Sequence, residues 1–217
     1  GDSFLTSKEV QQLLIANNQE WIYPLLFLAI NTGMRLGELA GLCWDRVNFE
    51  QGLIEVNRTL TREGLQQTTK SHRKRYVPLS NDIKSFLRNE LRLQKHPTFV
   101  LLDKKQEPID VNHISQRAFK DAAKKAGINN AKFHGLRHAF ASHFMMNGGN
   151  NYDLQKILGH SDLKMTMRYA HLSPEHLKST IGIVNFSAGG PHRGPHFIEE
   201  SKKGSSRITV AHTESKS

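Results

Sequence analysis

His134-Gly135-Leu136-Arg137-His138 opens a segment whose apolar residues recur at helical spacing. This spacing predicts an amphipathic helix from His134 to about Met146, which a pair of glycines then terminates. His134 and Arg137 are three residues apart, so both side chains project from one side of the helix start. A helix N-terminus attracts anions, and an arginine placed there without an anion partner is mildly unfavourable. The stretch therefore predicts a phosphate site.

Two more reactive side chains follow this helix. His160 comes directly after Gly159, at the expected end of the next helix, where it can donate a hydrogen bond to a phosphate oxygen. Tyr169 lies nine residues after His160, on a further helix that Ser161-Asp162 is expected to cap. A phenol has a pKa near 10, so its hydroxyl attacks phosphorus at neutral pH only when a base or nearby cations help.

The remaining candidates lie upstream. Arg35 follows Gly33, which is expected to end an apolar helix with a positive φ angle, and Glu38 is placed to orient the Arg35 guanidinium. Lys70 lies in the basic run of residues 68–75, before an expected strand, and can deliver a proton to a leaving oxygen. Each residue has an ordinary structural interpretation when it is taken alone. The ordered set of Arg, Lys, His, Arg, His and Tyr points to metal-free phosphodiester chemistry.

Composition favours a polyanionic partner. The 217 residues contain 30 Lys and Arg against 20 Asp and Glu, a formal charge of +10 at pH 7. Cys43 is the one cysteine, so no disulfide can form within the chain, and it is expected to be a small core residue. No apolar run approaches the roughly 20 residues of a membrane helix. We therefore expect no membrane association and a reducing, cytosolic compartment.

The periodicities predict an α+β fold that is mainly helical with a small antiparallel three-stranded sheet. The strands are expected in residues 47–49, 53–56 and 75–79, because short β-branched and aromatic runs alternate there with polar turns. Residues 1–186 are interpreted as one catalytic domain. From residue 187 the composition shifts to Gly, Pro, His, Ser and Lys, which predicts a tail over 187–217 that is flexible or is ordered by a partner.

The motifs at residues 33–39, 69–70, 134–138, 158–160 and 168–169 together resemble the tyrosine recombinase, or phage integrase, family. The resemblance covers about residues 4–186 and matches six functional positions in identity and order. It implies a site-specific recombinase that cleaves and rejoins double-stranded DNA through a 3′-phosphotyrosine. A mobile-element or prophage integrase is the default role.

The resemblance also implies a role for each residue. Arg35 and Arg137 would bind the scissile phosphate, and Lys70 would protonate the 5′-oxygen leaving group. His134 would accept or relay the tyrosine proton, His160 would support the phosphate, and Glu38 would support Arg35. Tyr169 would form the covalent link. Stabilising the charge of the pentacoordinate phosphorane is then the main catalytic contribution, and no cofactor or metal is required.

Members of this family usually carry an N-terminal helical core-binding domain, which is absent from this chain. We therefore interpret the chain as a fragment. The resemblance implies a tetramer on DNA, with a monomer when free, and accessory DNA-bending proteins as partners. The target sequence is not readable, because specificity depends on groove contacts and DNA shape that no single segment reveals.

Three alternatives remain at this point. A type IB topoisomerase would use a similar site to relax DNA without exchanging partners. A catalytically silent DNA-binding regulator would not need a nucleophile. A metal hydrolase built from some of the 12 histidines would need several ligands at fixed spacing, whereas His134, His138 and His143 give only a helical run.

Overall fold

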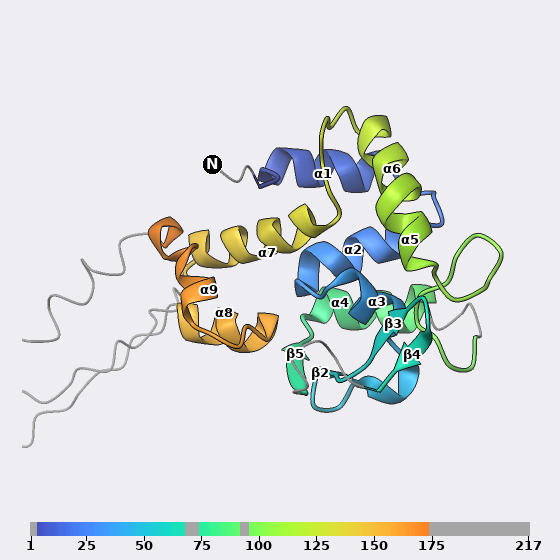
Figure 1. The fold of residues 1–217 in the computed structure, drawn as a ribbon, viewed down its shortest axis with the longest axis horizontal. Coiled ribbons are helices and arrows are strands. Elements are labelled where there is room, and N and C mark those ends of the chain that lie inside the picture. The colour runs from blue at the N-terminus through green and yellow to red at the C-terminus, as the bar shows by residue number, and fades with distance from the viewer. Residues whose placement is uncertain (1–3, 68–73, 92–95, 174–217) are drawn as a thin grey trace, which may run out of the picture.

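A computed structural model describes residues 4–67, 74–91 and 96–173 of the chain, which form a mainly helical body with a small sheet at one side (Figure 1). Its principal helices include α1 (Ser7–Ala16), α2 (Tyr23–Thr32), α3 (Leu36–Ala40), α4 (Asn81–Phe86), α5 (Val111–His113), α6 (Phe119–Lys125), α7 (His134–Met146), α8 (Asn151–Leu158) and α9 (Lys164–Met167). Shorter turns are the 3-10 turns η1 (Trp44–Arg46) and η5 (Ala170–Leu172) and the π-helical turns η2 (Leu87–Leu91) and η4 (Ile114–Ala118). The expected α+β, mainly helical class is confirmed.

The predicted three-stranded sheet is also confirmed. Strand β2 (Leu53–Val56) is central and pairs antiparallel with β1 (Val47–Asn48) and β5 (Arg75–Pro78). Side chains alternate along β5, so Arg75 and Val77 are buried while Tyr76 is exposed. This alternation places an arginine on the core face of the sheet, where it faces the helices.

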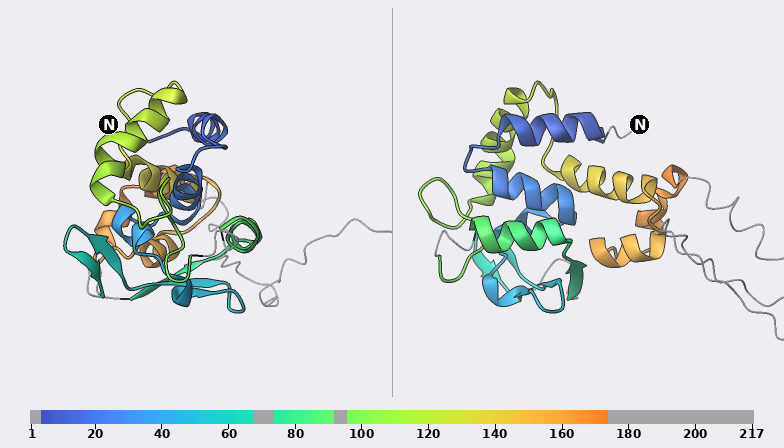
Figure 2. Two further views of the ribbon diagram at one scale, coloured as in Figure 1. Left: turned by 90° about the vertical axis from the view of Figure 1, so that its right-hand side faces the viewer. Right: turned by 180° about the vertical axis from the view of Figure 1, so that it is seen from behind.

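The helix predicted from His134 to Met146 has those bounds and runs across the middle of the molecule. It packs against α2, and the two helices lie side by side in Figure 1 and in the right-hand view of Figure 2. Helix α2 is apolar nearly all round and buries Leu25, Leu26 and Leu28 completely or nearly so. As predicted, Gly33 ends α2 in the left-handed conformation, with φ of 63°.

Tight contacts fix the crossing of α2 on α7. A Cβ atom on Gly33 would lie 2.4 Å from the Phe140 ring and 2.8 Å from the Leu158 side chain. Only glycine therefore fits at this point, both for its backbone angle and for the space that surrounds it. The expected core position of Cys43 is also confirmed, because its side chain is buried.

The structure differs from the sequence prediction in two places. An unexpected hairpin pairs β3 (Thr59–Thr61) with β4 (Gly64–Gln66); its polar, half-buried strands carry no clear alternation of apolar residues. Tyr169 does not lie within a helix: α9 ends at Met167, and Tyr169 precedes the turn η5. The tail of 187–217 lies outside the described residues. Among the residues that are described, no helix is long and apolar enough to cross a membrane.

Candidate functional site

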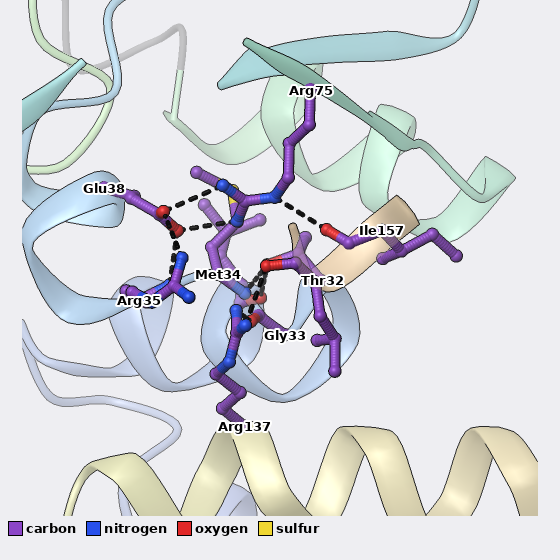
Figure 3. A network of polar contacts seen from close by, with 10 residues as sticks. Thr32, Gly33, Met34, Arg35, Glu38, Arg75, Arg137 and Ile157 are labelled. Atoms are coloured by element: carbon purple, nitrogen blue, oxygen red, sulfur yellow. Dashed lines mark hydrogen bonds and ion pairs between the residues drawn. The ribbon is translucent and has the colours of Figure 1, made fainter. Parts of the chain in front are cut away.

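A buried carboxylate organises the first half of the site. Glu38, only 3% exposed, accepts hydrogen bonds from both terminal nitrogens of Arg75 at 2.7 and 2.8 Å (Figure 3). It also accepts from the Arg35 side chain at 3.0 Å and from the Arg35 backbone at 2.8 Å. The forked pair fixes the plane of the Arg75 guanidinium. One side-chain bond and one backbone bond hold Arg35 against the same carboxylate. Arg35 keeps 29% of its side chain exposed, so its position is set while one side stays accessible.

Helix ends hold the second arginine. Arg137 rises from α7 and donates to the Gly33 carbonyl at the end of α2 and to the Leu158 carbonyl at the end of α8, each at 2.7 Å. Arg75 similarly donates to the Ile157 carbonyl at 2.7 Å. The last carbonyls of a helix lack partners within that helix and carry partial negative charge, so cations stabilise them. The two helix ends therefore place both guanidinium groups beside Glu38.

The resulting cluster is rich in positive charge. Burial opposes the charged form of Glu38, but the hydrogen bonds and charge of Arg75, helped by Arg35, lower the pKa of the carboxyl below its usual 4.5. Burial and the charge of Arg35 lower the pKa of Arg137 to about 9, so it still carries its proton at neutral pH. Three guanidinium groups thus surround one carboxylate, which leaves an excess of positive charge suited to an anion.

His160 closes this cluster from the side of α8. It follows Gly159, whose φ of 66° turns the chain at the helix end, and its Nδ1 lies 2.9 Å from the hydroxyl of the buried Thr166. Burial, followed by the charges of Arg137, Arg35 and Arg75, lowers the pKa of His160 to about 4. The imidazole is therefore neutral at pH 7, in a position where an added phosphate would favour its protonation.

Tyr169 belongs to the second half of the site and packs against α7. Its ring is 6% exposed and belongs to a second small core with Ala141, Met145, Leu154 and Leu158. The phenol oxygen lies 2.5 Å from Nδ1 of His138 in a hydrogen bond. The Arg168 guanidinium carbon lies 5.6 Å from the centre of the Tyr169 ring. The hydroxyl thus lies against an imidazole, and a cation lies over the ring that carries it.

Two clefts connect these halves. One, of about 630 Å³, is lined by Tyr169, His138 and His134 among others. The other, of about 480 Å³, is lined by Arg35, Glu38 and again His134. His134 therefore stands between the tyrosine and the first arginine. Burial first, and then the charges of His138 and Arg137, lower the pKa of His134.

The structure thus brings five of the six predicted residues to one region, together with Glu38. Lys70 lies outside the described residues, so its position relative to the clefts stays a prediction. Sequence reasoning missed Arg75 and His138. The alternation of β5 would have placed Arg75 with the buried Val77, and the spacing of four residues from His134 would have placed His138 on the same face of α7.

A mainly helical α+β body that gathers arginines, histidines and a tyrosine hydroxyl along adjoining clefts is the catalytic-domain fold of tyrosine recombinases. The chain belongs to the phage integrase family, whose model matches residues 3–176.

Individual relatives agree with this assignment. The integrase of Haemophilus phage HP1 is 41% identical over 116 residues, which are 52% of this chain and 29% of that protein. Tyrosine recombinase XerA of Pyrococcus furiosus is 29% identical over 187 residues, 83% of this chain and 61% of that protein. The solved catalytic domain of bacteriophage HP1 integrase superposes with a TM-score of 0.63 at 31% identity, covering 83% of this chain and 94% of that one. The chain spans half or less of the phage integrases that it matches.

Proposed function

We propose that the chain is the catalytic part of a site-specific recombinase that cleaves and rejoins DNA strands for a phage or another mobile element. The proposal rests on one observation. Tyr169 lines one cleft, Arg35 and Glu38 line another, and His134 lines both, so the nucleophile and the cation-rich cluster lie on either side of this histidine. A hydroxyl nucleophile beside groups that neutralise a phosphate is the arrangement that phosphoryl transfer needs.

The residues have distinct roles in this proposal. Arg35 and Arg137 bind the non-bridging oxygens of the scissile phosphate, and Glu38 holds Arg35 in place through the contacts described above. Neutral His160 gains a proton or donates its N–H as the phosphate enters. Tyr169 attacks phosphorus and becomes the 3′-phosphotyrosine, while Lys70 supplies a proton to the departing 5′-oxygen. Attack by a new 5′-hydroxyl then reverses these steps and restores a continuous strand.

The assembly is part of the proposal. Double-stranded DNA is the substrate, a tetramer is the working unit on DNA, and accessory DNA-bending proteins assist it in the bacterial nucleoid. Lambda integrase, which shares the fold at a TM-score of 0.62, has been solved as a tetramer bound to a Holliday junction. Residues 1–186 form the catalytic domain, and the tail of 187–217 docks on a neighbouring protomer. Deleting 187–217 should weaken the higher complexes in a gel shift while leaving single-protomer binding unchanged.

A suicide substrate tests the function. A duplex from the attachment site, nicked just beyond the scissile phosphate so that the cleaved fragment diffuses away, is incubated in EDTA with the wild type or with Tyr169→Phe. The proposal predicts a covalent protein–DNA band for the wild type and none for the variant. The absence of a band in the wild type, although it shifts the same duplex on a gel, would overturn the proposal and favour a regulator.

Strand exchange separates the proposed function from a topoisomerase. Two duplexes carrying the attachment site should yield recombinant products, whereas a topoisomerase would relax a supercoiled plasmid and leave the two duplexes unexchanged. Relaxation of plasmids regardless of sequence, without recombinants, would contradict the recombinase proposal but would keep Tyr169 as the nucleophile.

A further inference from the structure

Thr166 is a fully buried polar residue that contacts two residues of the site. It lies in α9, which packs beside α8, and it is 0% exposed (Figure 1). Its hydroxyl oxygen lies 2.9 Å from Nδ1 of His160, and among the described residues this is the only hydrogen bond of the Thr166 side chain. Its backbone carbonyl accepts a hydrogen bond from the backbone N–H of Tyr169 at 3.0 Å. One residue thus contacts both the His160 imidazole and the segment that carries the nucleophile.

The surroundings of Thr166 decide the direction of its hydrogen bond to His160. A buried hydroxyl whose proton has no acceptor costs free energy, and Nδ1 of His160 is the acceptor that the described residues place within reach. A neutral imidazole carries one proton, so an Nδ1 that accepts from Thr166 leaves the ring proton on Nε2. The opposite tautomer would make Nδ1 the donor and leave the Thr166 proton unpaired. The geometry therefore favours the tautomer with its N–H at Nε2.

The backbone of His160 is held independently of Thr166. The His160 N–H donates to the Gln155 carbonyl at 3.1 Å, and the His160 carbonyl accepts from the Gln155 side chain at 3.3 Å. These two bonds fix the chain at the end of α8 but leave rotation about the side-chain bonds free. A half-turn of the ring would exchange the positions of its nitrogens and carbons. The Thr166 hydroxyl opposes that rotation, because a ring carbon in the place of Nδ1 could not accept its proton.

The charged groups that surround His160 favour a neutral imidazole. Burial has the largest effect, and the charges of Arg137 from α7, Arg35 at the start of α3 and Arg75 from β5 follow, with a further contribution from His138. Together they lower the pKa of His160 to about 4. The ring therefore serves a phosphate at neutral pH as a hydrogen-bond donor. It can do so only if the N–H is on the nitrogen that does not face Thr166.

We propose that Thr166 is a positioning residue for the cleavage step: its hydroxyl donates to Nδ1 of His160, so that the Nε2–H of the ring binds a non-bridging oxygen of the scissile phosphate. The inference rests on the proposed recombinase function and specifies how His160 acts within it. Thr166 acts through its two contacts and not on the DNA. Its hydroxyl orients the donor and its carbonyl holds the turn that carries Tyr169, so the phosphate ligand and the nucleophile keep a fixed spacing.

Two substitutions separate the hydroxyl from the rest of the Thr166 side chain. Thr166→Val has the same shape without the hydroxyl, and Thr166→Ser keeps the hydroxyl without the methyl group. The rate of covalent complex formation is measured for each variant with saturating suicide substrate in EDTA. We expect Thr166→Val to be slower by about 10- to 100-fold, because a displaced donor stabilises the transition state less. Thr166→Ser should stay within a few fold of the wild type.

The affinity for the duplex separates positioning from binding. His160 is one phosphate contact among many, so gel shifts should give nearly the same affinity for the wild type, Thr166→Val and Thr166→Ser. Ser142→Ala is the matched control for the loss of a buried hydroxyl, since Ser142 is 1% exposed and its hydroxyl has no hydrogen-bond partner among the described residues. Its cleavage rate should stay within a few fold of the wild type. A loss as large as that of Thr166→Val would contradict a specific role for the Thr166 hydroxyl.

A double-mutant cycle shows whether Thr166 acts through His160. The ring is absent in His160→Ala, so adding Thr166→Val to that variant should cause no further loss of rate. Equal slowing by Thr166→Val in the wild-type and His160→Ala backgrounds would overturn the inference, because the hydroxyl would then act on something other than the imidazole. A Thr166→Val enzyme as fast as the wild type would overturn it as well. Neither result affects the proposed function, which fails only when the wild type forms no Tyr169-dependent covalent complex.

Histidine NMR tests the contact without any cleavage reaction. In wild-type protein labelled with ¹⁵N-histidine at pH 7, the His160 signals are identified by their absence from His160→Ala. Nδ1 should have the chemical shift of an unprotonated ring nitrogen, and Nε2 that of a nitrogen that bears hydrogen. Thr166→Val should move the Nδ1 resonance of His160, while the resonances of His96 and His113 should stay in place. A His160 ring that carries its proton on Nδ1 in the wild type would overturn the inference, whatever the activity of the variants.

Discussion

Glu38 is the residue on which the phosphate site most depends, because it binds two arginines from inside the protein. Glu38→Gln keeps the shape but removes the charge and leaves Arg75, with a side chain 7% exposed, without its counterion. Breaking a buried pair in this way costs about 3–5 kcal/mol of unfolding free energy. Urea denaturation measures the loss. The matched control is Glu20→Gln, whose partner Lys125 is half exposed and whose pair is worth about 0–1 kcal/mol. Equal losses of unfolding free energy in the two variants would contradict the role of Glu38 as the buried counterion of Arg35 and Arg75.

His160 makes stability depend on pH. Its pKa falls to about 4 in the folded protein from 6.5, so the unfolded chain binds the proton more readily between these values. The free energy of unfolding therefore rises with pH across this window. The contribution of His160 is lost as the pH drops from about 6.5 towards 4. His160→Asn should show a flatter profile in denaturation series at pH 7, 5.5 and 4.5. A wild-type profile that is no steeper than that of the variant would show that His160 is not held neutral.

At the scale of elements, the helix ends around Gly33 should tolerate no side chain. Gly33→Ala places a Cβ at a positive φ, which costs about 1–2 kcal/mol for an L-residue, and forces it against Phe140 and Leu158. We expect a loss of about 2 kcal/mol or more in thermal or urea unfolding. Gly135→Ala is the control, because a Cβ at that position in α7 meets nothing within 4 Å. It should be neutral or stabilising by up to about 1 kcal/mol. A Gly33→Ala protein as stable as the wild type would contradict the packing of α2 on α7.

Most of the helix ends and the sheet can be predicted from the sequence, whereas the long-range contacts of the site cannot. The bounds of α7, the glycine ends of α2 and α8 and the three-stranded sheet follow from local spacing, and they are found as predicted. The pairing of Glu38 with Arg75 joins residues 37 positions apart, and no local pattern encodes it. The sequence does not predict the hairpin β3–β4, because its strands are polar and show no apolar alternation. The sequence also predicts a helix through Tyr169, because no local signal marks the end of α9 at Met167. Packing decides that end, since the Tyr169 ring joins the small core beside α8.

For the whole molecule, the formal charge of +10 and the arginine cluster predict DNA binding that depends strongly on salt. Raising the salt from 50 to 200 mM should weaken the affinity for a duplex by more than about tenfold, because each neutralised phosphate releases counterions. Arg35→Gln should reduce the slope of log affinity against log salt by about one. Lys105→Gln, at an exposed position that lines neither cleft, serves as the control and should leave the slope unchanged. An affinity independent of salt would contradict a phosphate-binding surface.

The central claim is that Tyr169 carries the DNA, and mapping the covalent link tests it most directly. The covalent complex trapped with a suicide substrate is treated with nuclease and trypsin, and the peptide that retains the nucleotide is sequenced by mass spectrometry. The four tyrosines of the chain, Tyr23, Tyr76, Tyr152 and Tyr169, fall on four different tryptic peptides. The account predicts the modification on residues 169–178, at Tyr169. A nucleotide on any of the other three peptides, or on a residue other than tyrosine, would contradict it.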